Sequence, residues 1–378
     1  MKNIKLNGDR LIIGKGSIKY LETIKEDRIF IVTGGKSAYK NGTIDKIKQY
    51  FDTNNKNFEI FSGIKKNPDT NTVLDGIKEM EKFKPNLVLA IGGGSPIDAA
   101  KVMILLYEHK ELNFNNILSK DILNCSRAIK LIAIPTTSGT GTEVTKAAVI
   151  TFKEKNIKIG LKSMAFIPDI AILDAELTIS MPDNIVAETG LDALTHALEA
   201  YINHNLDDFT EVIAKGAIEG LFKYLPISYK DKSIEAREKV HYYQSMAGIA
   251  FHNVGLGMAH GISHAFGGKY NYGHGLLNGI CLPYILEYNK KDDIVNEKLK
   301  YLANFLNINS VTQEIHKLNK ELNIPNSFKE LGLSEEKFYN DLDGLIENSL
   351  KGSTIGNPVI MNEIEMKKVL ITIYNGKV

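Results

Sequence analysis

Between Arg28 and about residue 180, short apolar runs alternate with segments of helical periodicity, and this alternation restricts the fold more than any other feature of the sequence. In one helical segment, Val73, Ile77 and Met80 recur on a single face. The apolar runs are continuous, which is typical of strands covered on both faces of a parallel sheet. The sequence therefore predicts parallel β-α-β units. The expected strands are residues 29–32, 58–61, 87–91, 131–135 and 170–173, with a helix over residues 37–51.

The pattern changes beyond Pro182, where long helical periods dominate and strand patterns nearly vanish. Leu299, Leu302 and Leu306, for example, share one helical face. We therefore expect two domains. The first is an α/β domain with a parallel sheet at residues 1–183, and the second is an all-α domain at residues 184–378.

The overall composition excludes several classes of protein. A formal net charge of +1 over 378 residues leaves no basic surface of the kind that binds nucleic acid. No apolar run reaches the roughly 18 residues that a membrane span needs, and Met1–Arg10 lacks the apolar core of a signal peptide. The two cysteines, Cys125 and Cys281, show no metal-binding spacing. We expect a cytoplasmic protein that binds neither nucleic acid nor membrane.

A glycine-rich turn follows the expected strand at residues 87–91. Gly93 and Gly94 allow the backbone to approach a ligand closely, and the N–H groups at the start of the next helix favour a phosphate. Ser95 is expected to cap that helix, with Asp98 completing a capping box. The turn is not the G-x-G-x-x-G dinucleotide fingerprint. A plain strand-to-helix turn without a ligand explains the pattern about equally well.

A second polar loop, Thr136–Thr142, follows the expected strand at residues 131–135. Its hydroxyl groups and glycines suit phosphate or ribose oxygens, although an ordinary surface loop has the same composition.

Histidines and one aspartate are spaced for metal binding in the C-terminal half. Asp192 and His196 are one helical turn apart, His260 and His264 repeat that spacing, and His274 follows between glycines. A carboxylate with several imidazoles suits Fe(II), Zn(II) or Mn(II). Because a single Asp-x-x-x-His pair is usually an exposed polar pair, the residues alone leave a metal site and a polar surface equally open.

Five motifs occur in order along the chain: Gly92–Asp98, Pro135–Thr145, Gly190–Tyr201, the histidine-rich stretch ending at Gly275, and Gly356–Pro358. Together they resemble the iron-containing (group III) alcohol dehydrogenases, most of all the butanol dehydrogenase type. The resemblance covers essentially the whole chain. It implies an α/β nucleotide-binding domain followed by an all-α domain that binds metal and substrate.

The same resemblance implies roles for individual residues. Asp192, His196, His260 and His274 match the metal ligands of the family, for iron(II) or alternatively zinc(II). His264 matches a catalytic histidine near the substrate. The implied cofactor-binding residues are Gly35, Ser37, Asn67, Gly93, Gly94, Ser95, Asp98, Thr136, Thr137, Thr140, Lys158 and Phe251.

The segment Thr33–Gly42 bears on the choice of cofactor. Members that prefer NAD often carry an aspartate after the first strand, which would repel the 2′-phosphate of NADP. Here there is no carboxylate, and Ser37 with Lys36 or Lys40 would contact that phosphate. The sequence therefore favours NADP(H) over NAD(H).

The expected reaction is reversible hydride transfer between NADP(H), or NAD(H), and a small primary alcohol or aldehyde such as butanol or butyraldehyde. Family members are commonly dimers, so we expect a homodimer or larger homo-oligomer.

The alternatives are a dehydroquinate synthase-like lyase, a glycerol dehydrogenase-like polyol dehydrogenase and a non-catalytic nucleotide-binding protein. The first needs several cationic residues for its phosphorylated substrate, whereas Arg237 is the only arginine of the helical half. The second uses three protein ligands to its metal, whereas four candidates occur here.

Overall fold

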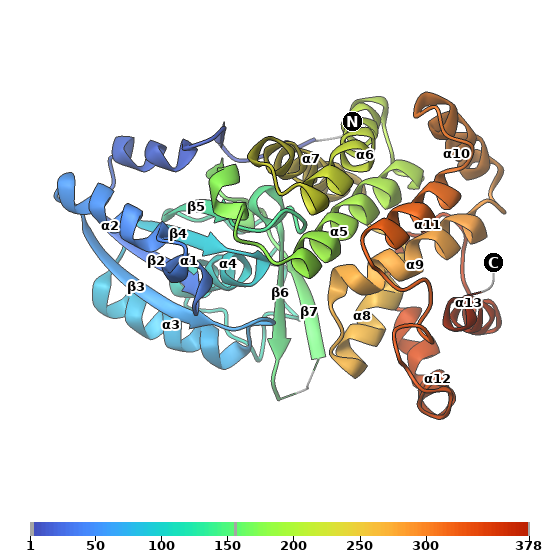
Figure 1. Ribbon diagram of the computed structural model, residues 1–378. Helices are drawn as coiled ribbons and strands as arrows, with labels where there is room; N and C mark the ends of the chain where they lie inside the picture. The colour runs from blue at the N-terminus through green and yellow to red at the C-terminus, as the bar shows by residue number, and fades with distance from the viewer. Residues whose placement is uncertain (1–3, 155–156, 377–378) are drawn as a thin grey trace. The chain divides into compact units, whose positions relative to one another are not determined.

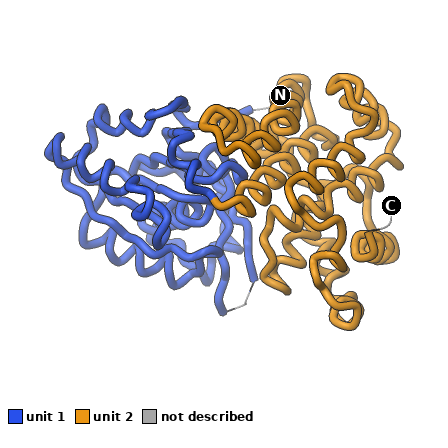
Figure 2. The backbone as a smooth tube through the Cα atoms, in the orientation of Figure 1, with its two compact units in different colours: residues 1–181 blue, residues 182–378 orange. Residues whose placement is uncertain are grey.

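The computed structural model describes residues 4–154 and 157–376. The chain forms two compact units that divide after residue 181 (Figure 2). A parallel sheet with covering helices makes up the first unit, and helices make up the second (Figure 1). The predicted fold class is therefore confirmed.

Six parallel strands form the sheet of the first unit, in the order β1-β8-β5-β4-β2-β3. Every residue of the central strand β4 is buried. Alternate β4 side chains enter two different cores: Val88 and Ala90 lie in one, Leu87 and Leu89 in the other. Coverage of both faces explains why the strand sequences are continuously apolar. The strands are β1 (Arg10–Ile13), β2 (Arg28–Gly34), β3 (Asn57–Ile64), β4 (Leu87–Gly92), β5 (Lys130–Pro135) and β8 (Ile170–Leu173).

A separate antiparallel hairpin, β6 (Ala147–Phe152) and β7 (Ile157–Lys162), follows the polar loop after β5. The α-helices among the described residues of the same unit are α1 (Ser37–Lys40), α2 (Thr43–Thr53), α3 (Thr70–Phe83) and α4 (Gly94–Glu108). The prediction of one continuous helix over residues 37–51 is wrong. The helix breaks at Gly42, whose φ of 75° lies in the left-handed region that only glycine adopts readily.

Helix α5 (Asp183–Ile202) is buried along most of its length and packs against α6, α7 and α9 in the second unit. Among the described residues, no helix is both long and apolar enough to cross a bilayer. The other helices are α6 (Asp208–Lys230), α7 (Ile234–Val254), α8 (Met258–Tyr270), α9 (His274–Asn289), α10 (Asp293–Phe305), α11 (Val311–Glu321), α12 (Glu335–Ser349) and α13 (Glu363–Asn375). Short 3-10 helices are η1 (Ser17–Thr23), η2 (Thr142–Val144), η3 (Met164–Phe166), η4 (Ala175–Thr178) and η5 (Gly352–Gly356).

Candidate metal centre and nucleotide-binding loops

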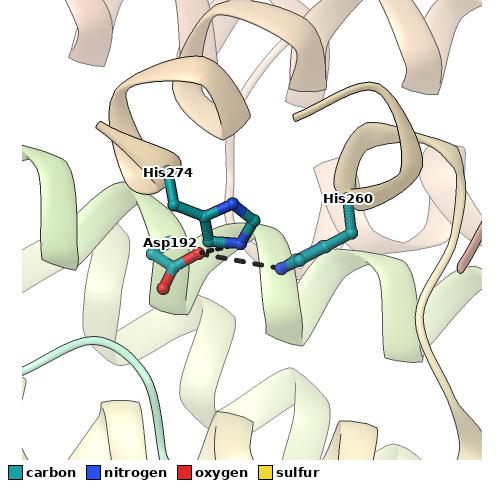
Figure 3. Close-up of side chains that lie close together, drawn as sticks. All are labelled: Asp192, His260 and His274. Carbon is teal, nitrogen blue, oxygen red and sulfur yellow. Dashed lines mark ion pairs between the residues drawn. The ribbon is translucent and has the colours of Figure 1, made fainter. Parts of the chain in front are cut away.

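Three helices of the second unit bring a carboxylate and two imidazoles together. Asp192 comes from α5, His260 from the first turn of α8, and His274 is the first residue of α9. The Oδ1 atom of Asp192 lies 3.7 Å from Nε2 of His260 and 3.6 Å from Nε2 of His274. One ligand atom from each residue lies within 4.8 Å of the other two, and Figure 3 shows the side chains pointing toward one another.

These separations fit a divalent metal ion. Ligands about 2.0–2.2 Å from a metal are roughly 2.8–3.6 Å from one another at octahedral or tetrahedral angles. The observed spacings lie at or slightly beyond the upper end of this range, so a cation fits between the atoms after small side-chain movements. A carboxylate oxygen with imidazole nitrogens is a donor set that Fe(II) and Zn(II) accept.

His196, the fourth expected ligand, lies on the same face of α5 as Asp192, as their spacing predicted. Its Nε2 atom is 3.9 Å from Oδ1 of Asp192, but it does not belong to the tight group of three atoms. Its ring stacks on His260, with 4.6 Å between ring centroids, and on Phe251, with 4.3 Å. Its role as a ligand stays a prediction.

A glycine beside His274 allows α9 to approach α5. A Cβ atom on Gly275 would lie 1.9 Å from the carbonyl oxygen of Glu188 and 3.2 Å from Cβ of Asp192. Because no side chain can occupy that space, the glycine keeps the first turn of α9 against α5. This contact brings the imidazole of His274 to Asp192.

Sequence reasoning missed Glu199, which orients the imidazole of His260. Oε2 of Glu199 accepts a hydrogen bond from Nδ1 of His260 at 2.6 Å. The same carboxylate accepts from the backbone N–H groups of Gly257 and Ala259, at 2.9 and 2.7 Å, and so caps the start of α8. With Nδ1 protonated, Nε2 offers its lone pair to a metal. The available signal was spacing, because Glu199 follows Asp192 by two helical turns.

The carboxylates on either side of His260 favour a positive charge there. Burial lowers the pKa of His260, but Glu199 and Asp192 outweigh burial and raise that pKa to about 9. Burial raises the pKa of Asp192, but the three imidazoles hold it well below its usual range. Desolvation, partly opposed by Asp192, lowers the pKa of His274. A cation bound between these carboxylates is therefore electrostatically favoured.

His264, the expected catalytic residue, is exposed on α8 one turn after His260. Its ring stacks on the ring of His274, with 4.9 Å between centroids and 10° between planes. His264 therefore contacts a candidate ligand and reaches solvent at the same time.

Most of the expected nucleotide-binding residues of the first unit follow the carboxyl ends of four adjacent strands. Gly35 and Ser37 follow β2, Asn67 follows β3, the glycine turn follows β4, and Thr136–Thr142 follow β5. These strands lie side by side as β5-β4-β2-β3. Ligands of open α/β sheets bind at such an edge, which makes these loops one candidate site.

The glycine turn and the threonine loop are packed against each other. A Cβ atom on Gly93 would lie 3.3 Å from Oγ1 of Thr137, and one on Gly94 would lie 3.1 Å from Cγ2 of Thr140. Glycine at these positions therefore lets the two loops form one continuous surface of N–H and hydroxyl groups. Thr136 is buried beside them.

The predicted cap of α4 is wrong. The helix starts at Gly94 after Gly93, with no side-chain cap, and Oγ of Ser95 accepts from the backbone N–H of Asn67 at 3.3 Å. Asp98 does not complete a capping box: its carboxylate accepts from Oγ1 of Thr142 at 2.6 Å and from the N–H of Val149 at 2.9 Å. Both side chains join neighbouring loops, which a local pattern does not reveal.

Sequence reasoning also missed Lys101, whose buried side chain holds the threonine loop and the residues after it by hydrogen bonds. Its Nζ donates to the carbonyl oxygens of Thr142, Thr145 and Ala147, at 2.6, 3.0 and 2.8 Å, and contacts Oγ1 of Thr142. The side chain is 1% exposed, and burial lowers its pKa to about 8. Lys158, an expected cofactor residue, lies on β7, where burial lowers its pKa as well.

Comparison with known proteins assigns both units to one family. The first matches the family described as iron-containing alcohol dehydrogenase over residues 8–175. The second matches the C-terminal part of the Fe-containing alcohol dehydrogenase family over residues 186–374.

Individual relatives match nearly the whole chain. An NADPH-dependent butanol dehydrogenase of Clostridium saccharobutylicum is 38% identical over 96% of this chain and 96% of its own length. A 1-propanol dehydrogenase of Citrobacter freundii is 33% identical over 98% and 99% of the two chains. The structure of an iron-containing alcohol dehydrogenase from Thermococcus thioreducens superposes with a TM-score of 0.92 at 31% identity and covers 100% of both chains.

Proposed function

Because this chain belongs to the iron-containing alcohol dehydrogenase family, we propose that it transfers hydride reversibly between NADP(H) and a small primary alcohol or aldehyde of about four carbons. The observation that carries the proposal is the convergence of Asp192, His260 and His274, because a metal ion held there would act as a Lewis acid on the substrate oxygen. In this proposal residues 1–183 bind the nucleotide, and residues 184–378 bind metal and substrate, with His196 as a fourth ligand.

The side chains around the metal centre have separate tasks. A bound iron(II) or zinc(II) ion supplies the positive charge that stabilises an alkoxide or polarises a carbonyl. Glu199 holds His260 through Nδ1, so that Nε2 is directed at Asp192, and Gly275 leaves space for His274 beside α5. His264 carries the substrate proton to solvent, because its ring stacks on His274 and is exposed.

Preference for NADP(H) rests on the segment after β2. Lys36, Ser37 and Lys40 are exposed there, with no carboxylate among residues 33–42. A 2′-phosphate would meet a hydroxyl and positive charge at this position. The Clostridium saccharobutylicum relative, named as NADPH-dependent, supports this choice. The proposal of butanol as the natural substrate rests on the same relative. We also propose a homodimer or larger homo-oligomer, because members of the family are commonly dimers or larger assemblies.

The test follows NADPH and NADH oxidation with aldehydes of two to six carbons, using enzyme loaded with Fe(II) under anaerobic conditions. We expect turnover that depends on metal, with the highest kcat/KM for butyraldehyde and at least tenfold preference for NADPH. No metal-dependent aldehyde reduction with either nucleotide would refute the reaction class. Equal or better use of NADH would refute only the cofactor choice.

The role of His264 is tested by His264→Ala. If the imidazole carries the proton, turnover falls about 10²-fold or more while metal content stays normal. Turnover equal to that of the wild type would remove His264 from the mechanism.

A further inference from the structure

The side-chain amide of Asn278 lies among the candidate metal ligands. It lies on α9, one turn after His274, and is 0% exposed. Its Nδ2 atom is 2.7 Å from Oδ1 of Asp192, 3.1 Å from Nε2 of His260 and 3.3 Å from Nε2 of His274. One end of the amide therefore contacts the same three atoms that would share a cation.

The hydrogen-bonding partners of Asn278 determine whether the nitrogen or the oxygen of its amide faces the candidate ligands. An amide nitrogen donates and cannot accept, so Nδ2 suits Asp192 and the imidazoles only while their lone pairs point at it. A divalent cation draws those lone pairs to itself. Each imidazole nitrogen has a single lone pair, so the N–H groups of Asn278 would then lose these two acceptors and direct positive hydrogens at the cation. Rotation of the amide by a half turn exchanges nitrogen and oxygen without other movement, and the carbonyl oxygen then faces the cation.

Ser263 can support both directions of the amide. Its Oγ lies 2.8 Å from the carbonyl oxygen of Ala259, one turn earlier in α8, and also contacts Oδ1 of Asn278. A hydroxyl carries one hydrogen, so it can donate to only one of these two oxygens. If it donates to Asn278, the amide oxygen faces Ser263. If it donates to Ala259, its own oxygen accepts from the amide nitrogen, and the amide is turned over.

We propose that Asn278 is a further residue of the metal centre, with its carbonyl oxygen facing a bound divalent cation and Ser263 accepting from its amide nitrogen. The oxygen adds a hard donor against the cation beside the Asp192 carboxylate. The inference rests on the metal centre of the proposed function, and it does not depend on the substrate or the nucleotide.

The test measures the dissociation constant for Zn²⁺, by competition with a chromophoric chelator, in protein first freed of metal. Asn278→Leu keeps the approximate volume but has no oxygen, so we expect affinity to fall about 10- to 100-fold, as for other residues that support a metal ligand. Asn278→Asp presents an oxygen in either direction, so it should bind Zn²⁺ within threefold of the wild type or more tightly.

Asn289→Leu is the matched control. Asn289 lies at the end of the same helix, is also 0% exposed, and exchanges hydrogen bonds with Asn357 at 3.0 and 2.7 Å. Its loss should lower the melting temperature without a change in Zn²⁺ affinity.

Unchanged affinity in Asn278→Leu, or an equal loss in Asn278→Leu and Asn278→Asp, would overturn the inference. Failure of the wild type to bind Zn²⁺ would refute the metal centre itself. If Asn278→Leu does not fold, the ratio of Asn278→Asp to wild type decides alone, and a tenfold weaker Asn278→Asp overturns the inference.

Discussion

The orientation of the His260 imidazole depends on Glu199, a side chain that is not itself a candidate metal ligand. Glu199 bonds to Nδ1 of His260 and to N–H groups at the start of α8, so one carboxylate sets both the ring direction and the helix start. Its own burial raises its pKa, but His260 and those N–H groups outweigh burial and lower it. Glu199 is therefore charged at neutral pH and holds the imidazole firmly.

Replacement of Glu199 by glutamine tests this positioning role. The amide bonds Nδ1 more weakly, and its NH₂ group opposes the N–H donors of α8. We expect about 10- to 100-fold weaker metal binding, measured by chelator competition. As a control, Ser233→Ala removes the cap of α7, where Oγ accepts from the N–H of Ala236. It should cost about 1 kcal/mol of stability and leave metal affinity unchanged.

Replacement of Gly275 by alanine tests the close approach of α9 to α5. The new methyl group would overlap the carbonyl oxygen of Glu188, so α9 has to move, with strain of about 1–3 kcal/mol. His274 moves with it, and metal content after purification should fall. Gly268, on α8, has no atom within 4 Å of an added Cβ, so Gly268→Ala should keep full metal content. Equal metal content in the two variants would contradict this account.

At the scale of elements, the start of α3 and the β6-β7 hairpin are hydrogen-bonded to the loop after β3, one of the candidate nucleotide-binding loops. Asp69 caps α3, accepting from the N–H of Thr72 at 2.8 Å, two residues after Asn67. Thr151 of β6 donates through its backbone N–H to Pro68 at 2.8 Å. The loop after β3 is thereby joined to both α3 and the hairpin.

Asp69 should make stability depend on pH. Burial raises its pKa, but the hydrogen bonds from Thr72 and the nearby lysines outweigh burial and lower the pKa below its usual value. Because the folded-state pKa is lower than the unfolded one, this stabilisation is complete above the unfolded pKa and is lost as pH falls through the folded pKa.

Asp69→Asn keeps a capping oxygen but has no charge and does not titrate, so the wild type should melt at a higher temperature than the variant at pH 7. Below pH 4 the wild type should lose stability relative to the variant. Asp69→Ala should cost about 1 kcal/mol at pH 7. Parallel melting curves of wild type and Asp69→Asn from pH 7 to pH 3 would show that this carboxylate does not contribute as described.

At the scale of the whole molecule, the candidate metal ligands and the candidate nucleotide-binding loops lie in different units. The candidate metal ligands all belong to residues 182–378, and the loops after β2, β3, β4 and β5 all belong to residues 1–181. Each unit has its own interior, and each could be stabilised by its own ligand.

Metal removal should therefore act locally. Binding stabilises a site by about 4 kcal/mol when the metal concentration is a thousand times the dissociation constant. After chelation we expect faster amide hydrogen exchange in α5, α8 and α9, and unchanged exchange in β2, β4 and β5. Mass spectrometry of peptides from both units makes the comparison within one sample. Faster exchange in the sheet strands would contradict a locally held metal.

Sequence patterns predicted the parts of this structure that depend on near neighbours in the chain. Continuous apolar runs identified β2, β4 and β5, since a strand buried on both faces has no polar side. The spacing of Asp192 and His196 placed both on one face of α5. The break at Gly42 was not predicted, because the sequence does not reveal whether a glycine within a helical pattern adopts a positive φ.

Local order along the chain determined the two kinds of unit, the strands, and the residue types available for a metal and a nucleotide. Tertiary structure alone decided which of those residues meet. Glu199 and His260 are far apart in sequence, as are Lys101 and Ala147, and Ser95 and Asn67. Such contacts depend on how helices and strands pack, and packing is set by the shapes of whole surfaces that no local periodicity encodes.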